Sequence, residues 1–516
     1  MCDRRRFAAM VSVCLIAGLA RAQDLAARLG AVIEAPEYRH GRWGLLVVEA
    51  DSGRALYERN ADQFFMPAST TKLYSCSSAL HHLGPDYRFE TPVYRRGPVE
   101  NGTLRGDLIL VASGDLTLGG RTLPDGTLAF TNNDHTYADS TTTTESLTPT
   151  DPLTGLNALA RQVRTAGIER VEGDVLIDAR LFDAASSSGS GPRVVTPIVV
   201  NDNVIDVIVT PAATADQPAA VTLRPEAAFV TVDAQVRTTA DGHPAIDVSG
   251  AGPGRVVVGG RVPVTAKPQL RTHAVDDPAA FARGLFIEAL RRAGVDVTAS
   301  PLRESRAALP ERDRYGRLTR VAVFVSPPFA ETVRVTLKVS QNLYAGTMPL
   351  LVATKHGERT LAAGLHRQRQ FLRELGVDTD AVSFGGGAGG DRADSTTPRA
   401  TVSLLRALAK RPDWPALDAG LPVLGVDGTL AGAVAPESPA RGRVRAKTGT
   451  LWYEDVLNDR ALLRSKALAG MLTTARGTKL VIAMFVNDVS LPRGDSPTRV
   501  GKVLGHLCEI LYEHAD

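Results

Sequence analysis

A serine and a lysine three residues apart begin an expected helix in the stretch MPASTTKLYSC, residues 66–76. Residues i and i+3 share one face of a helix, so the Lys72 ammonium would lie within hydrogen-bond reach of the Ser69 hydroxyl. Pro67, just before the helix, would place that hydroxyl near the positive end of the helix dipole. A lysine desolvated there could lose its proton and act as base for the serine. Taken alone, the pair more often belongs to a capped helix with a solvated lysine.

Two further motifs lie far along the chain. The stretch KVSQNLY contains Ser340-x-Asn342, and RAKTGTL contains Lys447 followed by Thr448, Gly449 and Thr450. Ser340 could relay a proton between the lysines and a leaving group, and the Asn342 amide could donate to a substrate amide. Taken singly, the first motif is also typical of a polar helix end and the second of a surface turn. The occurrence of all three motifs in this order favours a shared chemical role.

Residues 447–450 would supply the binding half of such a site. Lys447 presents positive charge to a substrate carboxylate, and Gly449 lets a substrate backbone lie close against the strand. The backbone N–H groups of Ser69 and Thr450 would form an oxyanion hole. These groups suit acyl transfer through a serine nucleophile. The ten histidines form no zinc-spaced cluster in the sequence, so we expect neither a metal nor another cofactor.

The ordered motifs Ser-x-x-Lys, Ser-x-Asn and Lys-Thr-Gly resemble the signature of penicillin-binding proteins and serine β-lactamases. The long gap between Ser69 and Ser340 is unlike β-lactamases, which place these motifs much closer together. Longer stretches, among them PASTTKLYSCSSALHHLGPDYRFET, VNDNVIDVIVTP and GRVRAKTGTL, are similar to the D-alanyl-D-alanine carboxypeptidase/endopeptidase family. That family comprises the class C low-molecular-mass penicillin-binding proteins (penicillin-binding protein 4 type), and the likeness covers nearly the whole mature chain.

This resemblance implies a serine enzyme that acts on peptidoglycan stem peptides. Ser69 would form the acyl-enzyme with Lys72 as base, and β-lactams would acylate the same serine. The resemblance also implies that Asp178 and Phe182, in IDARLF, face the peptide stem. A strand-end aspartate and a core phenylalanine are the alternative interpretation of those two residues.

The pattern of apolar residues predicts the fold class and its division. Apolar runs around a turn at 51–53 predict a β-hairpin, and two strands with a closing helix are expected near the end of the chain. Both chain ends would therefore build one sheet. The resemblance implies a central antiparallel sheet flanked by helices, an α/β (α+β) transpeptidase/β-lactamase-like domain of residues 23–95 and 311–516. Residues 96–310 read as inserted, mainly β material, which the resemblance divides into two nested domains.

The first residues predict export. Residues 1–22 have a basic start, an apolar run and an Ala-Arg-Ala cleavage signature, which indicates a signal peptide cut after Ala22 and a periplasmic protein. Their four arginines and one aspartate carry the whole formal net charge of +3. The near-neutral mature chain argues against nucleic acid and a polybasic anchor, while peripheral membrane association stays open. Cleavage after Ala22 would leave Cys76 and Cys508 as the cysteines of the mature chain, and we expect them to be separately buried thiols.

Three departures from the family pattern accompany the intact motifs. In GGGAGGDRADSTTP, Gly386 and Ala388 stand where the family has an aspartate and a serine, near its active site. Gly346 replaces a common acidic residue. The stretch WYEDVLNDRALLRSK adds about a dozen residues after KTGTL, which could form a lid, narrow the cleft or contact a partner.

Two other functions remain as alternatives. A peptidoglycan-binding scaffold with a weakened site would account for the altered loop and the added segment, and a β-lactamase or esterase would use the same motifs. The sequence leaves open the balance of carboxypeptidase and endopeptidase activity, the preferred diamino acid, the oligomeric state, and Sec or Tat export.

Overall fold

The computed structural model describes residues 23–252, 254–305 and 307–514, so the predicted signal peptide of residues 1–22 lies outside the described residues. The chain forms two compact units. The first contains the chain up to Ser78 and from Gln368 onward, and the second contains Ala79–Arg367. The domain boundaries near residues 95 and 311 stay a prediction.

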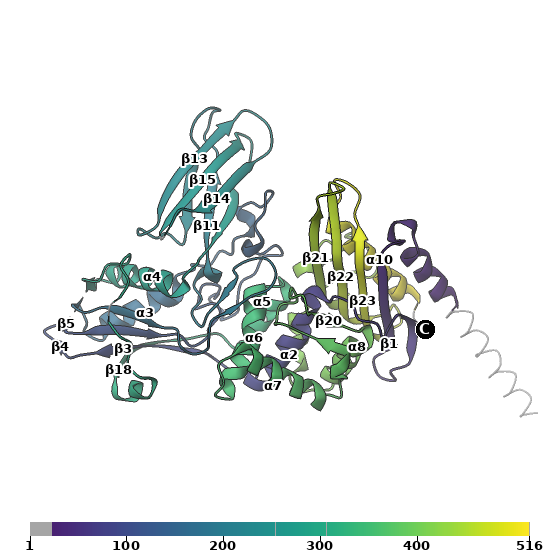
Figure 1. Ribbon diagram of the computed structural model, residues 1–516, viewed down its shortest axis with the longest axis horizontal. Coiled ribbons are helices and arrows are strands. Elements are labelled where there is room, and N and C mark those ends of the chain that lie inside the picture. Colours follow the sequence, from purple (N-terminus) through teal and green to yellow (C-terminus); the bar gives the residue numbers. More distant parts are fainter. Residues whose placement is uncertain (1–22, 253, 306, 515–516) are drawn as a thin grey trace, which may run out of the picture. The chain divides into compact units, whose positions relative to one another are not determined.

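The first unit is organised by a five-stranded antiparallel sheet in the order β2-β1-β23-β22-β21 (Figure 1). Its strands are β1 (Arg42–Glu49), β2 (Ala55–Arg59), β21 (Val444–Asp455), β22 (Arg460–Thr473) and β23 (Lys479–Ser490). The hairpin from the start of the chain pairs through β1 with β23 near its end. The predicted sheet built from both chain ends is therefore confirmed.

Helices cover both faces of this sheet, which explains why β1 and β23 are almost continuously apolar and buried. They are a helix over 23–33, α2 (Lys72–Leu83), α8 (Pro398–Leu408), α9 (Trp414–Gly420) and α10 (Pro497–His514). On one face, Leu504 and Leu507 of α10 share a core with Leu45 of β1. Cys76 and Cys508 are both buried and unpaired, as expected. No helix among the described residues is long and apolar enough to cross a membrane.

The second unit carries the inserted β regions. Two four-stranded sheets have the orders β18-β3-β6-β8 and β17-β7-β5-β4, and two three-stranded sheets have the orders β12-β11-β16 and β13-β15-β14. The strands are β3 (Glu90–Arg96), β4 (Val99–Glu100), β5 (Thr103–Leu104), β6 (Asp107–Val111), β7 (Arg170–Val171), β8 (Val175–Asp178), β11 (Val204–Thr210), β12 (Ala220–Arg224), β13 (Thr231–Thr239), β14 (Ala245–Gly250), β15 (Arg255–Pro263), β16 (Gln269–Ala274), β17 (Asp296–Val297) and β18 (Thr319–Val325). Short pairs β9 (Ala185–Ser186) with β10 (Val194–Val195), and β19 (Val382–Ser383) with β20 (Ser395–Thr396) in the first unit, complete the strands.

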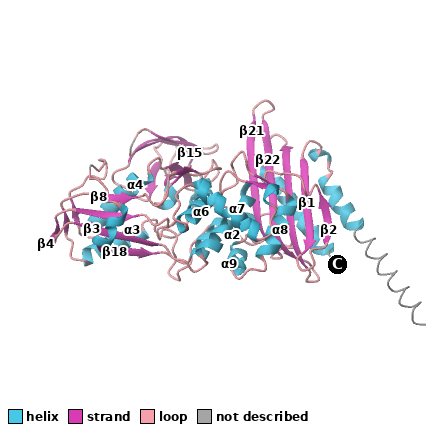
Figure 2. Ribbon diagram, turned by 60° about the horizontal axis from the view of Figure 1, so that its bottom comes forward, coloured by secondary structure: helices cyan, strands magenta, loops and turns pink. Residues whose placement is uncertain are grey.

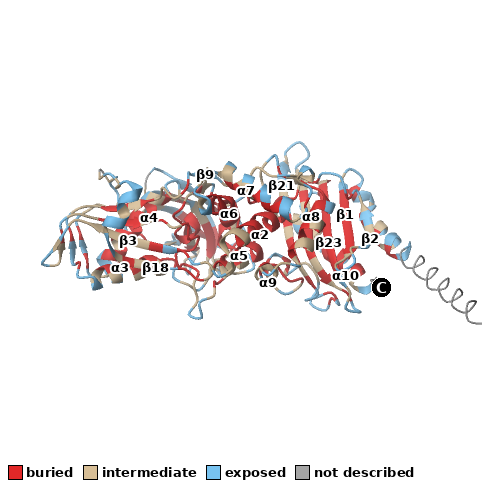
Figure 3. Ribbon diagram, turned by 90° about the horizontal axis from the view of Figure 1, so that it is seen from below, coloured by how far each residue is buried: buried red, intermediate tan, exposed pale blue. Residues whose placement is uncertain are grey.

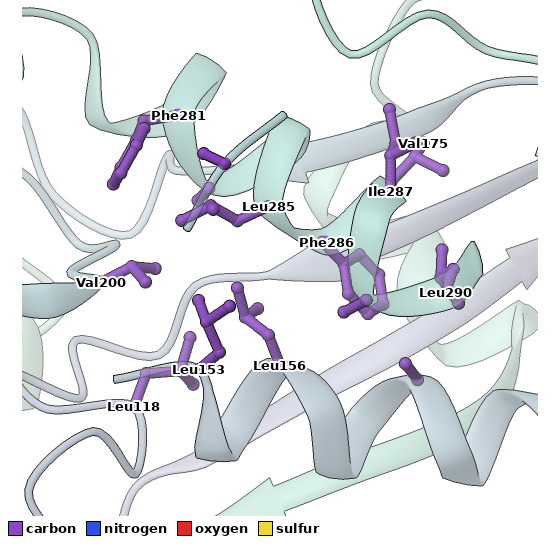
Figure 4. Packing of buried hydrophobic residues seen from close by; sticks show 14 of the residues in the cluster. Leu118, Leu153, Leu156, Val175, Val200, Phe281, Leu285, Phe286, Ile287 and Leu290 are labelled. Carbon is purple, nitrogen blue, oxygen red and sulfur yellow. The ribbon is translucent and has the colours of Figure 1, made fainter. Parts of the chain in front are cut away.

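Helices α3 (Thr154–Thr165) and α4 (Pro278–Arg292) form the main apolar core of the second unit with these sheets. Figure 4 shows Phe286 and Leu290 of α4 with Leu156 of α3 in one packed group of buried side chains. The Asp277 side chain caps α4 by accepting from the N–H groups of Ala279 and Ala280.

The Ser-x-Asn motif lies at a break between two helices. The apolar segment after residue 330 forms α5 (Phe329–Lys338) and α6 (Asn342–Lys355), followed by α7 (Leu361–Glu374). Residues Asn342–Ala353 of α6 are all buried (Figure 3). The break between α5 and α6 centres on Ser340, whose φ of +63° lies in the left-handed region that side chains disfavour. A buried helix thus holds the motif in a strained conformation.

Candidate active site

Ser69 lies in a short 3-10 turn, Ala68–Thr71, directly before α2 begins at Lys72. Ala68 in this turn has a φ of +46°, which costs a residue with a Cβ about 1–2 kcal/mol. Two glycines enclose the turn. A Cβ at Gly389 would lie 1.9 Å from the Ala68 carbonyl oxygen, and one at Gly449 would lie 2.5 Å from the Pro67 carbonyl oxygen. Glycine is therefore required on both sides for the turn to fit.

The Lys72 ammonium contacts the serine directly. Its Nζ donates to Ser69 Oγ at 2.8 Å and to the Ala388 carbonyl oxygen at 2.8 Å, and the side chain is fully buried. Burial lowers the pKa of Lys72 to about 7, although Cys76 and Asp394 favour its charged form. The amine is therefore partly neutral near pH 7, which lets its lone pair accept the serine proton.

The altered loop meets Lys72 through its backbone. The Ala388 carbonyl oxygen, rather than a side chain, accepts from Lys72, and the Gly387 carbonyl oxygen accepts from Ser75 Oγ at 2.8 Å. The buried Asp394 carboxylate holds the loop by accepting from the N–H groups of Gly385 at 3.0 Å and Asp391 at 2.8 Å. Burial raises the pKa of Asp394 to about 6 against these N–H bonds. The departures at 386 and 388 therefore leave the loop's contact with Lys72 in place.

Lys447 is the second buried lysine of this unit. Lys447 lies on β21 and its side chain is fully buried. Its Nζ donates to the Thr448 carbonyl oxygen at 2.8 Å. Burial lowers the pKa of Lys447 well below its ordinary value, and repulsion from Lys72 lowers it further. A carboxylate brought to this ammonium would reverse the shift by favouring the charged form. Lys447 is thus suited to bind an anionic group, and without such a group its charged form is disfavoured.

The residues that follow Lys447 have separate surroundings. Thr448 Oγ1 donates to Thr429 Oγ1 at 2.7 Å, while Thr450 is exposed and its Oγ1 accepts from Lys466 Nζ at 2.9 Å. Gly449 faces the turn that carries Ser69, as its approach to Pro67 shows. The structure therefore brings Ser69, its lysine and the Lys-Thr-Gly strand together within one unit.

Ser340 and Asn342 belong to the second unit, where several groups fix them. The Tyr137 hydroxyl donates to the Ser340 carbonyl oxygen at 2.5 Å, and Asn342 Nδ2 donates to the Ser190 carbonyl oxygen at 2.9 Å. A Cβ at Gly346 would lie 3.0 Å from Ser187 Oγ. A larger side chain there would crowd Ser187, which gives a steric reason for the glycine where the family often has an acid.

A buried charged cluster lies next to this motif, and it was not predicted from the sequence. His135 Nδ1 is 2.6 Å from Asp206 Oδ1, its Nε2 is 2.7 Å from Asp202 Oδ2, and the Tyr344 hydroxyl of α6 donates to Asp202. The Arg121 guanidinium pairs with Asp202 and, at 2.6 Å, with Asp134. We call these residues the Arg121–His135 network.

The Arg121–His135 network is an ion-pair cluster rather than a metal site. Asp134, His135 and Asp202 lie close enough together to hold a cation. However, both ring nitrogens of His135 are engaged by carboxylates, and the guanidinium of Arg121 already carries a positive charge against Asp202. Burial disfavours the imidazolium, but Asp206 and Asp202 outweigh burial and raise the pKa of His135 to about 10. A protonated ring has no lone pair to offer a metal.

Asp178 and Phe182 are occupied inside the second unit. The Asp178 carboxylate pairs with Arg180 at 2.8 Å and accepts from the Tyr315 hydroxyl at 2.6 Å. Phe182 is 1% exposed. Their contact with a peptide stem stays a prediction, and neither residue shares a hydrogen bond with a motif residue in the described contacts.

The sequence profile of the D-Ala-D-Ala carboxypeptidase 3 (S13) family matches residues 25–500. The chain belongs to this family. It is a serine-type D-Ala-D-Ala carboxypeptidase, and the resemblance drawn from the motifs is confirmed.

Two relatives from different bacteria match most of this S13 chain. It is 29% identical to the D-alanyl-D-alanine carboxypeptidase of Actinomadura sp. (strain R39), over 87% of this chain and 82% of that protein. It is 26% identical to the D-alanyl-D-alanine carboxypeptidase DacB of Haemophilus influenzae, over 88% and 87% of the two chains.

A solved structure matches the fold. Penicillin-binding protein 4 (dacB) from Haemophilus influenzae has a TM-score of 0.69 at 21% identity and covers 95% of this chain and 99% of its own. The same protein complexed with a β-lactam has a TM-score of 0.68, also at 21% identity, and covers 95% of this chain and 99% of its own. The predicted penicillin-binding-protein fold with inserted β regions is confirmed.

Proposed function

We propose that this S13 enzyme is exported to the periplasm and hydrolyses peptidoglycan stem peptides through an acyl-enzyme on Ser69. The Ser69 oxygen attacks the carbonyl carbon of the penultimate D-alanine, and its proton passes to the neutral amine of Lys72. The N–H groups of Ser69 and Thr450 hold the oxyanion. The C–N bond then breaks, and the terminal D-alanine leaves as an amine after taking up a proton. Water hydrolyses the ester and regenerates the serine.

The observation that carries this proposal is the state of Lys72. Its amine lies 2.8 Å from the Ser69 hydroxyl, and burial lowers its pKa to about 7. An ordinary surface lysine would be almost wholly protonated at neutral pH and could not accept a proton. The position and the lowered pKa together suit a general base.

The remaining motif residues take the roles that their chemistry suits. Ser340 carries the proton to the leaving amine, and Asn342 donates to an amide of the stem. Lys447 and Thr448 bind the terminal carboxylate, while Gly449 gives the substrate backbone access to the strand. We assign to Asp178 and Phe182 a contact with the peptide stem of the substrate.

The same steps at a D-alanyl-to-diamino-acid cross-link would give endopeptidase activity. β-Lactams would acylate Ser69, because their strained amide replaces the scissile bond and their carboxylate replaces that of D-alanine. The complex of the Haemophilus protein with a β-lactam supports this step. The reaction as written uses no metal or other cofactor.

One experiment tests the proposal against both alternatives. The mature protein and a Ser69→Ala variant are incubated with a fluorescent penicillin and then with a cross-linked muropeptide. We expect stable labelling and release of D-alanine or cleaved cross-links from the wild type only. Rapid turnover of the penicillin would indicate a β-lactamase. Labelling without any peptide hydrolysis would indicate a peptidoglycan-binding scaffold.

A further inference from the structure

The added segment after KTGTL lengthens the motif strand instead of forming a separate loop. Strand β21 continues without interruption from Val444 to Asp455, and β22 begins at Arg460. Their pairing runs from Val444 with Leu472 to Asp455 with Arg460, so the added residues form a two-stranded extension (Figure 2). We call residues 451–464 the extension hairpin.

The two sides of this hairpin differ because side chains alternate along a strand. Lys447, Gly449, Leu451 and Tyr453 therefore share one side of β21. That side faces the Ser69 turn, since Ser465, the cross-strand partner of Leu451, donates through Oγ to the Met66 carbonyl oxygen at 2.7 Å.

Trp452 lies on the opposite side together with Thr450. Thr450 Oγ1 accepts from Lys466, and the Lys466 side chain packs near Gly501 of α10. The pairing shifts between Leu451 and Trp452, but the extra residue, Arg464, is on β22. The alternation along β21 is therefore retained.

Tyr453 is a large side chain left open to solvent on the motif side of the strand. It is 55% exposed, while Trp452 on the other side is 51% exposed. Strand β21 is also the end strand of its sheet. Val423 pairs with Arg445 at the start of its outer edge, and an extended peptide can lie along that edge beyond this pairing. An exposed aromatic beside an open edge offers apolar contact area for such a peptide.

The proposed function sets the direction of that peptide, and the inference rests on it. Lys447 binds the terminal carboxylate and the Thr450 N–H holds the oxyanion, so the leaving D-alanine lies beside the start of the motif. The rest of the stem must then run past Thr450 toward Asp455. Tyr453 lies three positions beyond Thr450, about 10 Å along a strand that rises about 3.3 Å per residue. An extended stem covers that distance in about three residues.

We infer that Tyr453 is a specificity residue that contacts the stem about three residues upstream of the scissile bond. The extension hairpin thereby makes the enzyme prefer substrates with a full-length stem over short acyl-D-alanyl-D-alanine peptides. The partner that fits this surface is the upstream part of a peptidoglycan stem, bound in extended form beside β21.

The test compares a stem pentapeptide with its C-terminal tripeptide, which lacks the upstream residues. We expect Tyr453→Ala to lower kcat/KM for the pentapeptide about fivefold to tenfold and to leave the tripeptide unchanged, a loss typical of one aromatic contact. Tyr453→Phe should retain most of the preference. Trp452→Ala is the matched control, with similar exposure on the opposite side of the same strand.

Fluorescent penicillin labelling separates this inference from the proposed function. If the wild type is not acylated and hydrolyses neither peptide, the proposed function fails. If the wild type is active, three results would overturn the inference alone. These are no effect of Tyr453→Ala, an equal loss for both peptides, or the same loss in Trp452→Ala, which would point to a general disturbance of the hairpin.

Discussion

Lys72 and Lys447 of the first unit and His135 of the second are all buried cations, yet their pKa values move in opposite directions. Burial lowers the pKa of Lys72 to about 7 and that of Lys447 well below its usual range. Carboxylates outweigh burial at His135 and raise its pKa to about 10. Arg121 beside it is likewise held in its charged form by Asp134 and Asp202 against burial.

The pKa values differ because the surrounding carboxylates bind different groups in the two regions. In the Arg121–His135 network, Asp134, Asp202 and Asp206 all contact cationic groups directly. Asp394, whose charge favours the charged form of Lys72, accepts from the backbone N–H groups of Gly385 and Asp391. Around Lys72 the charged form is therefore easily lost, and a lysine must be neutral to accept a proton. Buried charges held by ion pairs stabilise a structure, whereas buried cations whose pKa is lowered supply reactivity.

The largest effect is expected from replacing Lys72, the buried cation whose pKa is lowered. Lys72→Met should lower the rate of Ser69 acylation by about 10²–10⁴-fold, since it removes a general base. The apparent Tm should stay equal or rise, because an apolar side chain of similar length suits a fully buried position. Acylation kinetics with a fluorescent penicillin and a thermal melt measure the two quantities.

Lys479→Met is the control for this comparison, because Lys479 is an exposed residue at the start of β23. It should change neither quantity. A clear loss of stability in Lys72→Met with acylation retained would contradict the contrast between the two regions.

Breaking the paired cluster should act on stability first. Asp202→Ala would leave Arg121 and His135 buried without their shared carboxylate, which should destabilise the second unit by about 3–5 kcal/mol. Urea unfolding followed by circular dichroism measures the change. Asp62→Ala, which removes an exposed partner of Arg399, should have little effect. Equal effects of the two substitutions would show that the network contributes no more than a surface pair.

The motifs predicted the first of these regions much better than the second. Ser69 and Lys72 are three residues apart on one helix start, so their contact follows from local geometry. The sheet from both chain ends was also predictable, because its strands show continuous apolar runs bounded by turns. The Arg121–His135 network joins residues from 121 to 344. Asp202 and Asp206 lie in the family-like stretch VNDNVIDVIVTP, but nothing in that stretch indicates that they contact His135.

Other features escaped prediction because the backbone supplies them. The altered loop contacts Lys72 through the Ala388 carbonyl oxygen, which any residue provides, so the side chain at 388 could not indicate this contact. The left-handed conformation of Ser340 depends on the break between α5 and α6, and the pattern of apolar residues runs through that break. The extension hairpin follows from pairing between β21 and β22, and the irregular mixture of apolar and polar residues over 452–466 does not specify that pairing.

The smallest predicted effect is that of pH, which should act differently on the site around Lys72 and on the Arg121–His135 network without any substitution. Lys72 faces Cys76, Asp394 and Lys447, and with a pKa of about 7 its neutral form is lost as pH falls below that value. Acylation of Ser69 should therefore fall about tenfold per pH unit on the acid side and level off above pH 7.

The network should respond on the alkaline side instead. The pKa of His135 is raised on folding from 6.5 to about 10, so its contribution to stability is complete below pH 6.5 and is lost as pH rises through about 10. The urea midpoint, measured beside the acylation rate, should therefore decline from neutral pH toward pH 10 while acylation stays level. A urea midpoint that instead falls in step with acylation below pH 7 would mean that acid unfolds the site, and that Lys72 does not set the profile.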